Sequence, residues 1–326
     1  MRHLTRRELL KAGVATAVLV RPARAATSAV YLIRTTNREE GVRRGFAALG
    51  WPAVKGKRVV IKPNFNSPDP FPASTHLDTL GTLVRQLQAA GVSEVSVADR
   101  SGMGNTRKVM ERKGVFAQAK QLDFHPVVLD ETPMDGWTEE RLSGSHWSRG
   151  VLFPRLLQEA DLLVQTCCLK THRYGGHFTL SLKNSVGIVA KYSPRDGYNY
   201  MGELHGTSHQ REMIAEINQL YRPAMVVMDG LEAFTDGGPE SGTLVKPEVM
   251  LLGTDRVAMD AVGVAILRMY GGNPTISRGR VFDQEQIARA VQLGLGARGP
   301  EQIDLITEDP ESKKLAERVR EVLMRG

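Results

Sequence analysis

The sequence is poor in cysteine. Its 326 residues include two cysteines, the neighbours Cys167 and Cys168. Adjacent residues of an extended strand point to opposite faces, so a disulfide between these two would strain the backbone. An ordinary iron–sulfur cluster needs four cysteine ligands, so we expect no intrinsic cluster. We interpret both thiols as buried strand-end residues, and the sequence leaves open whether they have a redox role.

Long apolar runs and a general excess of charge are also lacking. A transmembrane helix needs about 20 apolar residues, so we expect no stable membrane span. The composition, 41% hydrophobic and 24% charged, is that of a globular protein. The net charge is +7, but residues 1–25, with six basic side chains and one acidic side chain, contribute +5 of it. The nearly neutral remainder argues against nucleic-acid binding.

Residues 1–25 carry a targeting pattern. The pair Arg6-Arg7 precedes a modest apolar run, residues 12–20, and Ala23-Arg24-Ala25 supplies the small residues that a signal peptidase accepts. This pattern predicts a Tat signal peptide that is cleaved before Ala26, rather than an amphipathic first helix. We therefore expect export through the Tat translocase to the periplasm or the extracellular space. Since that route carries folded proteins, it also favours a bound cofactor, whose identity the sequence does not define.

Strands and helices alternate along residues 26–326. This alternation predicts a three-layer α/β/α sandwich with a mostly parallel sheet. We place its core at 29–271 and a C-terminal α/β extension at 272–326. Division into two lobes stays open, with 130–150 as the best candidate for a break. The expected strands are 29–33, 58–61, 95–98, 126–129, 162–164, 224–228, 249–252 and 303–306, and the expected helices are 38–49, 76–90, 155–159, 210–220, 257–269, 283–293 and 312–324.

The richest stretch for function is 164–187. A buried strand leads into Lys170 and His172, and a helix expected to begin near Thr179 carries Lys183. Polar groups just past a strand end lie where open α/β sheets bind ligands. The free N–H groups of a helix start, beside two ammonium groups, predict a carboxylate or phosphate site. Our first hypothesis is an enzyme in which Lys170 and Lys183 bind a small anion and His172 transfers protons.

Further candidate residues follow other expected strands. A strand-end lysine, amide or carboxylate can complete a ligand pocket, and paired glycines permit close backbone approach. A capped turn at Asp99 and a tight turn at the glycines would explain the same pattern equally well. Asp260 is expected to be only a helix-terminus charge, and Thr75 a helix cap. The candidate ligand-binding residues are Lys62, Asn64, Asp99, Asn184, Asp229, Gly237 and Gly238.

Three histidines are candidate metal ligands. Imidazole is a frequent ligand of divalent metals, and His205 and His209 would share one helix face if a helix ran through both. With His177, and with His172 acting as a ligand instead of a base, they support a rival hypothesis, a metal- or cofactor-binding assembly protein that serves an iron–sulfur or redox partner without turnover. A solute-binding receptor, with affinity but neither metal nor chemistry, is the third alternative.

Taken in order, these motifs resemble the domain of unknown function 362 family over residues 29–271. The resemblance implies one α/β domain. Many members of that family add a ferredoxin-type cluster domain, which this sequence lacks. A fainter likeness, at His172, Gly175, Gly176 and Lys183, is to the N-terminal domain of nickel-pincer lactate racemases and implies organic-acid or metal-cofactor chemistry. The family motifs are Lys62-Pro63-Asn64, the Asp99 loop, Lys170-Thr171-His172, 179–184 with Gly187, Asp229-Gly230, Gly238-Pro239 with Gly242, and Asp255 with Asp260-Ala261.

Overall fold

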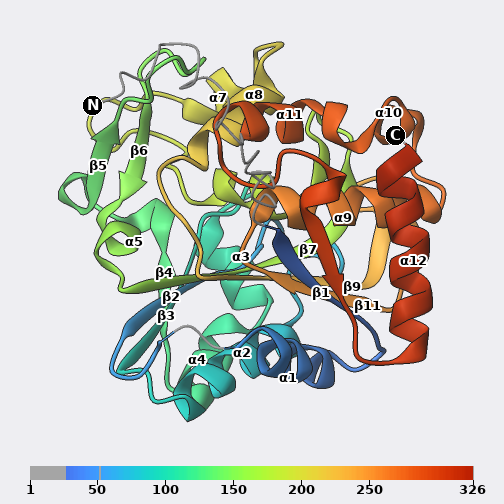
Figure 1. The fold of residues 1–326 in the computed structure, drawn as a ribbon. Helices are drawn as coiled ribbons and strands as arrows, with labels where there is room; N and C mark the ends of the chain where they lie inside the picture. Colours follow the sequence, from blue (N-terminus) through green and yellow to red (C-terminus); the bar gives the residue numbers. More distant parts are fainter. Residues whose placement is uncertain (1–26, 51–52, 326) are drawn as a thin grey trace, which may run out of the picture.

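A computed structural model describes residues 27–50 and 53–325 (Figure 1). The predicted Tat signal peptide lies outside these ranges. Within them, no helix combines the length and apolarity needed to cross a bilayer.

One ten-stranded sheet runs through the molecule, in the order β12-β1-β11-β9-β7-β2-β3-β4, with β10 paired to β9 and β8 to β7. Five of the seven pairings along this order are parallel, and β11 is antiparallel to both of its neighbours. The prediction of a mostly parallel sheet is confirmed. The strands are β1 (Ser28–Arg34), β2 (Arg58–Lys62), β3 (Glu94–Asp99), β4 (His125–Val128), β7 (Leu162–His172), β8 (His177–Thr179), β9 (Met225–Gly237), β10 (Gly242–Val245), β11 (Val249–Gly253) and β12 (Ile303–Ile306).

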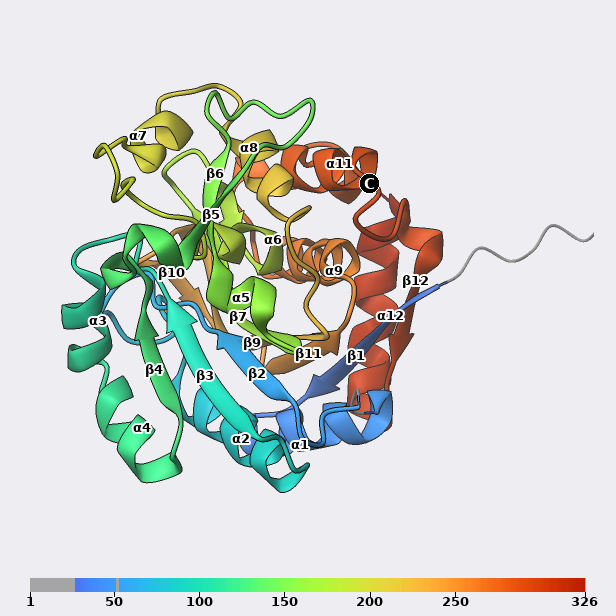
Figure 2. The ribbon, with the colours of Figure 1, turned by 90° about the vertical axis from the view of Figure 1, so that its left-hand side faces the viewer.

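Helices cover both faces of the sheet (Figure 2). Because side chains alternate along a strand, Tyr31 and Ile33 of β1 pack against one helical layer, and Val30 and Leu32 pack against the other. This arrangement confirms the three-layer sandwich. One layer holds α1 (Arg38–Leu49), α2 (Leu77–Ala89), α3 (Thr106–Arg112) and α4 (Val115–Leu122). The other holds α5 (Arg155–Glu159), α6 (Ser181–Asn184), α7 (Tyr200–His205), α8 (Gln210–Ile217), α9 (Arg256–Met269), α10 (Pro274–Ser277), α11 (Glu285–Gln292) and α12 (Pro310–Arg325).

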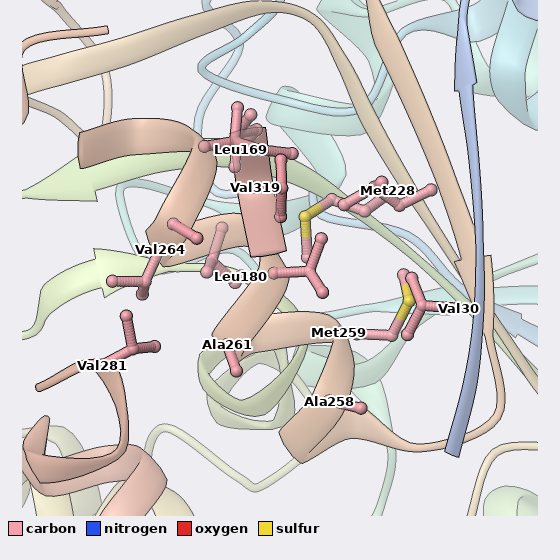
Figure 3. Packing of buried hydrophobic residues seen from close by; sticks show 14 of the residues in the cluster. Val30, Leu169, Leu180, Met228, Ala258, Met259, Ala261, Val264, Val281 and Val319 are labelled. Atoms are coloured by element: carbon pink, nitrogen blue, oxygen red, sulfur yellow. The ribbon is translucent and has the colours of Figure 1, made fainter. Parts of the chain in front are cut away.

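The helix α9 forms the centre of the second layer. All twelve residues from Arg256 to Leu267 are buried, as expected for a helix that is largely apolar on every side. Figure 3 shows side chains of β1, β7 and β9, such as Leu169 and Met228, gathered around it. A Cβ atom on Gly263 would lie 2.8 Å from Leu180 Cδ1, so a glycine is needed for this close packing.

The segment 130–150 is not a break between two lobes. Together with the strand that follows it, the segment forms a two-stranded sheet of β5 (Trp137–Glu140) and β6 (Val151–Pro154). Trp137, Trp147 and Phe153 are buried in the same apolar cluster as Val60 of β2. This sheet therefore belongs to the layer that covers one face of the main sheet. The 3-10 turns are η1 (Leu129–Glu131), η2 (Met134–Gly136), η3 (Ser185–Gly187), η4 (Val281–Asp283) and η5 (Pro300–Gln302).

The strand order reverses direction between β2 and β7. The chain moves outward from β2 through β3 to β4 and then returns to place β7 on the other side of β2. In open α/β sheets, the crevice beyond the carboxyl ends of strands at such a reversal is where ligands bind. Lys62, Asp99 and His172 are the last residues of β2, β3 and β7, so the fold brings them to this crevice.

Candidate functional site

A cavity of about 650 Å³ opens at this crevice. A second hollow of about 40 Å³ lies beside it, and because the two share His172, Lys183 and Arg100, we describe the small hollow as the floor of the cavity. The floor is lined by Lys62, Asn64, Asn66, Asp99, Arg100, Gly102, His172, Thr179, Lys183, Asn184, Val186 and Gly187. The wider part adds Met103, Tyr174, Lys191, Tyr192, Asn199, Met201, Gly202, His205 and Pro239.

Lys62 and Asp99 form a buried ion pair in the floor, with Lys62 Nζ 2.6 Å from Asp99 Oδ1. Lys62 also donates to Pro63 O at 2.6 Å and to Asn184 Oδ1 at 3.0 Å. Burial lowers the pKa of Lys62 and raises that of Asp99, whereas the contact and two backbone N–H donors to the carboxylate favour the ionised pair. With all three ammonium hydrogens engaged, Lys62 holds the floor together and has no spare hydrogen for a ligand.

Lys170 is not a free anion-binding residue, contrary to the sequence prediction. It is completely buried, and Nζ donates to Asn64 Oδ1 at 3.0 Å, to Ala73 O and to Pro239 O at 3.3 Å. These acceptors take all three ammonium hydrogens. Lys170 therefore fastens the loop after β2 and the Pro239 turn to β7, behind the cavity wall.

The N-terminus of α6 is not a free anion site either. The helix expected to begin near Thr179 begins at Ser181 instead, since Thr179 belongs to β8. This helix is only four residues long. Its first N–H groups, of Ser181 and Leu182, donate to the two carboxylate oxygens of Asp260 at 2.7 and 3.0 Å. Asp260 is thus a buried cap for α6, not merely a charge at the end of its own helix.

Lys183 and His172 differ from these satisfied groups. Within the described residues Lys183 makes no hydrogen bond and no ion pair, and burial together with Arg100 and Lys170 lowers its pKa to about 7. His172 Nδ1 is buried without a partner, and burial and the Lys183 charge lower the pKa of His172 well below 6.5. A Cβ atom on Gly176 would lie 2.5 Å from Lys183 Cε and 3.0 Å from His172 Nδ1, so the two side chains lie close together.

Other buried polar atoms without a hydrogen-bond partner lie in the residues of the floor. In the part of the chain that the structure describes, nine buried side-chain polar atoms lack a hydrogen-bond partner. Three of them, His172 Nδ1, Asn66 Nδ2 and Thr179 Oγ1, belong to residues that line the floor. Buried polar groups are rarely left unpaired, because each costs about 1–3 kcal/mol. Their concentration here indicates a place for a polar ligand.

Several lining residues were missed by sequence reasoning. Arg100 follows Asp99 and is fully buried, with its guanidinium held by the backbone carbonyls of Val186, Val189 and Ser101. Burial lowers its pKa. Its position directly after a strand end was the available signal, but arginine is most often exposed. The polar loop after residue 190 also lines the cavity, through Lys191, Tyr192 and Asn199.

The three predicted metal ligands are not brought together. His205 lines the cavity, and its Nδ1 contacts Gln210 at 2.8 Å. His209 lies outside the cavity lining and stacks on His146, while His177 begins β8. His205 ends α7 and His209 precedes α8, so no single helix aligns them. Among the described residues, no group of three or more His, Cys, Asp or Glu could hold a metal.

Asp229 does not reach the cavity. It points to the opposite face of the sheet, where Oδ2 accepts from Arg38 Nε at 2.8 Å and from Thr79 Oγ1 at 2.6 Å. Side chains alternate between the two faces of the sheet along β9, so a shift of one position moves a side chain to the opposite face. Asp229 joins α1 and α2 to the sheet and is not a ligand-binding residue.

Gly237 and Gly238 serve packing. A Cβ atom on Gly238 would lie 2.0 Å from the carbonyl oxygen of Thr171, and one on Gly237 would lie 2.9 Å from Ser241 O. Gly238 also has φ of +64°, which favours glycine. The close approach that these glycines permit is to the backbone of β7 and of the β9–β10 turn, and only Pro239 of this turn lines the cavity.

The cavity carries positive charge. Asp99 is the one acidic residue among the described residues that line either part, and its charge is paired with Lys62. Arg100, Lys183 and Lys191 are the other charged groups. Lys191 Nζ lies 3.7 Å from Asp130 Oδ2, and Asp130 itself does not line the cavity. The charges of the lining that lack a partner within it are therefore positive.

The fold and crevice define a three-layer α/β protein with a ligand cavity at the reversal of its strand order. The family model described as "Domain of unknown function (DUF362)" matches residues 59–265. This match spans more than half of the chain and includes the floor residues from Lys62 to Gly187. The chain belongs to the DUF362 family, which confirms the resemblance drawn from its motifs.

Two further likenesses accompany this match. The chain is 24% identical over 222 residues to the thylakoid-associated protein sll1697 of Synechocystis sp., covering 66% of this chain and 64% of that protein. The chain thus matches less than two thirds of that relative's length. The lactate racemase apoprotein of Thermoanaerobacterium thermosaccharolyticum matches 90% of this chain and 86% of its own, with 14% identity and a TM-score of 0.42.

Proposed function

We propose that the protein is an enzyme that binds a small organic anion, a carboxylate or a phosphate, and uses His172 for proton transfer. The observation that carries this proposal is the cluster of unpartnered polar atoms in the floor, beside the free amine of Lys183. Most of these groups can donate hydrogen bonds, as an anion requires.

The floor provides complementary charge and donors. Lys183, Asn66 and Thr179 line one hollow, and a bound carboxylate or phosphate oxygen would accept from donors of these kinds. Lys62 and Lys170 contribute indirectly, by fixing the walls through their own saturated contacts. A bound anion would also offset the mutual repulsion of Lys183 and Arg100.

His172 has the state that proton transfer requires. With a pKa well below 6.5, its imidazole is neutral at pH 7 and can accept a proton. A bound anion would raise this pKa toward neutrality, because it favours the charged imidazolium. The base is therefore weak in the free protein and becomes stronger when the anion is present.

The test begins with the ligand that the purified protein carries. Mass spectrometry of small molecules released by denaturation identifies it, and calorimetry with that compound gives its affinity. Lys183→Met should weaken binding at least about tenfold, since a charge-assisted contact is lost. His172→Asn should retain binding but lose proton exchange between the ligand and solvent D₂O, followed by NMR. His125→Asn, an exposed residue of β4, is the matched control.

Binding without proton exchange in either protein would reject the enzyme and leave a receptor. Unaltered exchange in His172→Asn would reject the assignment of the base. A redox or iron–sulfur partner remains a prediction from the sequence.

Export is a separate proposal. It is supported by the Arg6-Arg7 pair, the short apolar run and the Ala23-Arg24-Ala25 pattern. Expression of the full chain in a Tat-competent bacterium should give an exported form that begins at Ala26. Replacing both Arg6 and Arg7 by lysine should retain the protein in the cytoplasm, and unchanged export of that variant would reject the Tat route.

A further inference from the structure

Exposed apolar side chains gather at the mouth of the cavity. The described part of the chain has five large hydrophobic side chains that are clearly exposed, and three of them line this cavity. They are Met103, Tyr174 and Tyr192, with exposed fractions of 36%, 47% and 55%. The other two, Leu244 of β10 and Met324 of α12, lie outside the cavity lining. Scattered exposed apolar residues need no explanation, but a convergent group marks a binding surface.

These side chains come from separate parts of the chain. Met103 belongs to the loop after β3, Tyr174 to the turn between β7 and β8, and Tyr192 to the loop before α7. Val186, which lines both the floor and the wider part, and Met201 of the wider part add to the apolar lining. The cavity therefore has a polar, positively charged end at the floor and an outer end where apolar and aromatic side chains lie beside Lys191, Asn199 and His205.

Tyr174 connects the two ends. Its ring meets the ring of His172 edge-on, with the centroids 5.8 Å apart. On its outer side, the Arg173 guanidinium lies 4.9 Å from the Tyr174 ring centroid, and the Tyr174 hydroxyl donates to Glu240 at 3.3 Å. These contacts hold the ring at the cavity wall, close to the proposed base.

We propose that the ligand is an amphipathic organic anion. Its carboxylate or phosphate lies in the floor beside Lys183, and its apolar body, of the size of an aromatic ring or larger, packs against Tyr174, Tyr192 and Met103. This inference rests on the anion site proposed above. The cavity volume of about 650 Å³ supports it, because such a volume fits a drug-sized molecule and greatly exceeds what acetate or inorganic phosphate fills.

Matched pairs of probes test this inference by calorimetry on the full chain. Phenylacetate is compared with acetate, and phenyl phosphate with inorganic phosphate. At least one ring-bearing probe should bind about tenfold or more tightly than its partner, since it adds aromatic contact and apolar burial. The two pairs also separate a carboxylate ligand from a phosphate ligand.

Variants identify the side chains that give the ring-bearing probe its higher affinity. Tyr192→Ala and Met103→Ala should remove most of the preference for the ring-bearing probe while leaving the affinity for acetate or phosphate within about twofold of its original value. Met324→Ala is the matched control for Met103→Ala and should change neither affinity. Lys183→Met should weaken both members of a pair.

The outcomes distinguish the two proposals. Equal affinities within each pair would overturn the amphipathic ligand and leave the anion site intact. A preference that survives Tyr192→Ala and Met103→Ala, or one that Met324→Ala also removes, would overturn it as well. If none of the four probes binds, both the anion site and this inference are rejected.

Discussion

The carboxylate of Asp260 accepts a hydrogen bond from the backbone N–H of Ser181 at 2.7 Å, across 79 positions of the sequence. Its second oxygen accepts from Leu182 N at 3.0 Å. A four-residue helix is not stable by itself, so this buried cap is what fixes the start of α6. Lys183 is the next residue, and its position in the cavity floor therefore depends on Asp260.

Asp260→Asn should disturb both stability and binding. Burial raises the pKa of Asp260 to about 7, so at pH 8 the carboxylate is largely ionised and accepts from both N–H groups. Asparagine retains one acceptor and turns an NH₂ group toward the other donor. We expect the free energy of unfolding at pH 8 to fall by about 1–3 kcal/mol in urea titrations. Affinity for phenylacetate should fall as well, and Asp236→Asn, at an exposed carboxylate, should change neither.

Lys183→Met should stabilise the ligand-free protein while it weakens anion binding. The amine is buried without a partner, and methionine fills similar space without a charge. At pH 6 we expect the free energy of unfolding to rise by about 1–3 kcal/mol. A purely structural lysine would give the opposite sign, so a destabilised variant would contradict the ligand-binding assignment.

The pH dependence of stability gives an independent check on the same lysine. Its pKa is lowered from the ordinary lysine value of 10.5 to about 7 in the folded protein, so the unfolded chain binds more protons between these two values. The stability of the original protein should therefore rise with pH across about 7–10.5 relative to Lys183→Met. Lys120→Met, at an exposed residue of α4, should show the slope of the original protein.

Three lysines that follow expected strands looked alike in the sequence and proved different in the structure. The pattern correctly located Lys62, Lys170 and Lys183 near one edge of a mostly parallel sheet, because strand ends follow from hydrophobic periodicity. Whether an ammonium group is free depends on partners that are distant in the chain. Lys62 forms an ion pair with Asp99, and Lys170 donates a hydrogen bond to Asn64. No local sequence pattern predicts these two contacts.

The same limit explains the other errors. The strand of Asp229 was predicted, but the face to which Asp229 points depends on the register of β9 within the sheet, which a short apolar run does not define. The glycines of the β9–β10 turn correctly predicted that another group approaches this backbone closely. Only the tertiary structure shows that the group next to Gly238 is the backbone of β7 and not a ligand.

Lys62→Met should be strongly destabilising, in contrast to Lys183→Met. Asp99 is only 1% exposed, so the substitution would leave its carboxylate buried without its charged partner. Removing one partner of a buried ion pair costs about 3–5 kcal/mol. Urea unfolding at pH 7 measures this loss. The double variant Lys62→Met with Asp99→Asn should recover part of the stability, and an additive loss instead would show that the two groups do not interact.

Anion affinity should fall as the pH rises above 7. Below this value Lys183 is protonated in the free protein, so binding requires no proton uptake by this amine. Above it, binding must protonate the amine, and the affinity should fall by up to about tenfold per pH unit until the raised pKa of the complex is reached. Calorimetry with phenylacetate, which stays ionised throughout, measures the profile. An affinity that is constant to about pH 9.5 would show that the Lys183 charge is not used.

Gly176→Ala should remove anion binding by a steric route. The added Cβ atom would lie 2.5 Å from Lys183 Cε, and since that lysine is flexible, the side chain must move while the backbone stays in place. Stability should change by less than about 1 kcal/mol, and the affinity for phenylacetate should fall at least about tenfold. The decisive comparison is a double-variant cycle with Lys183→Met. If Gly176 acts by leaving room for the lysine, Gly176→Ala should cause little further loss once Lys183 is methionine, whereas an equal loss in both backgrounds would place its effect elsewhere in the cavity.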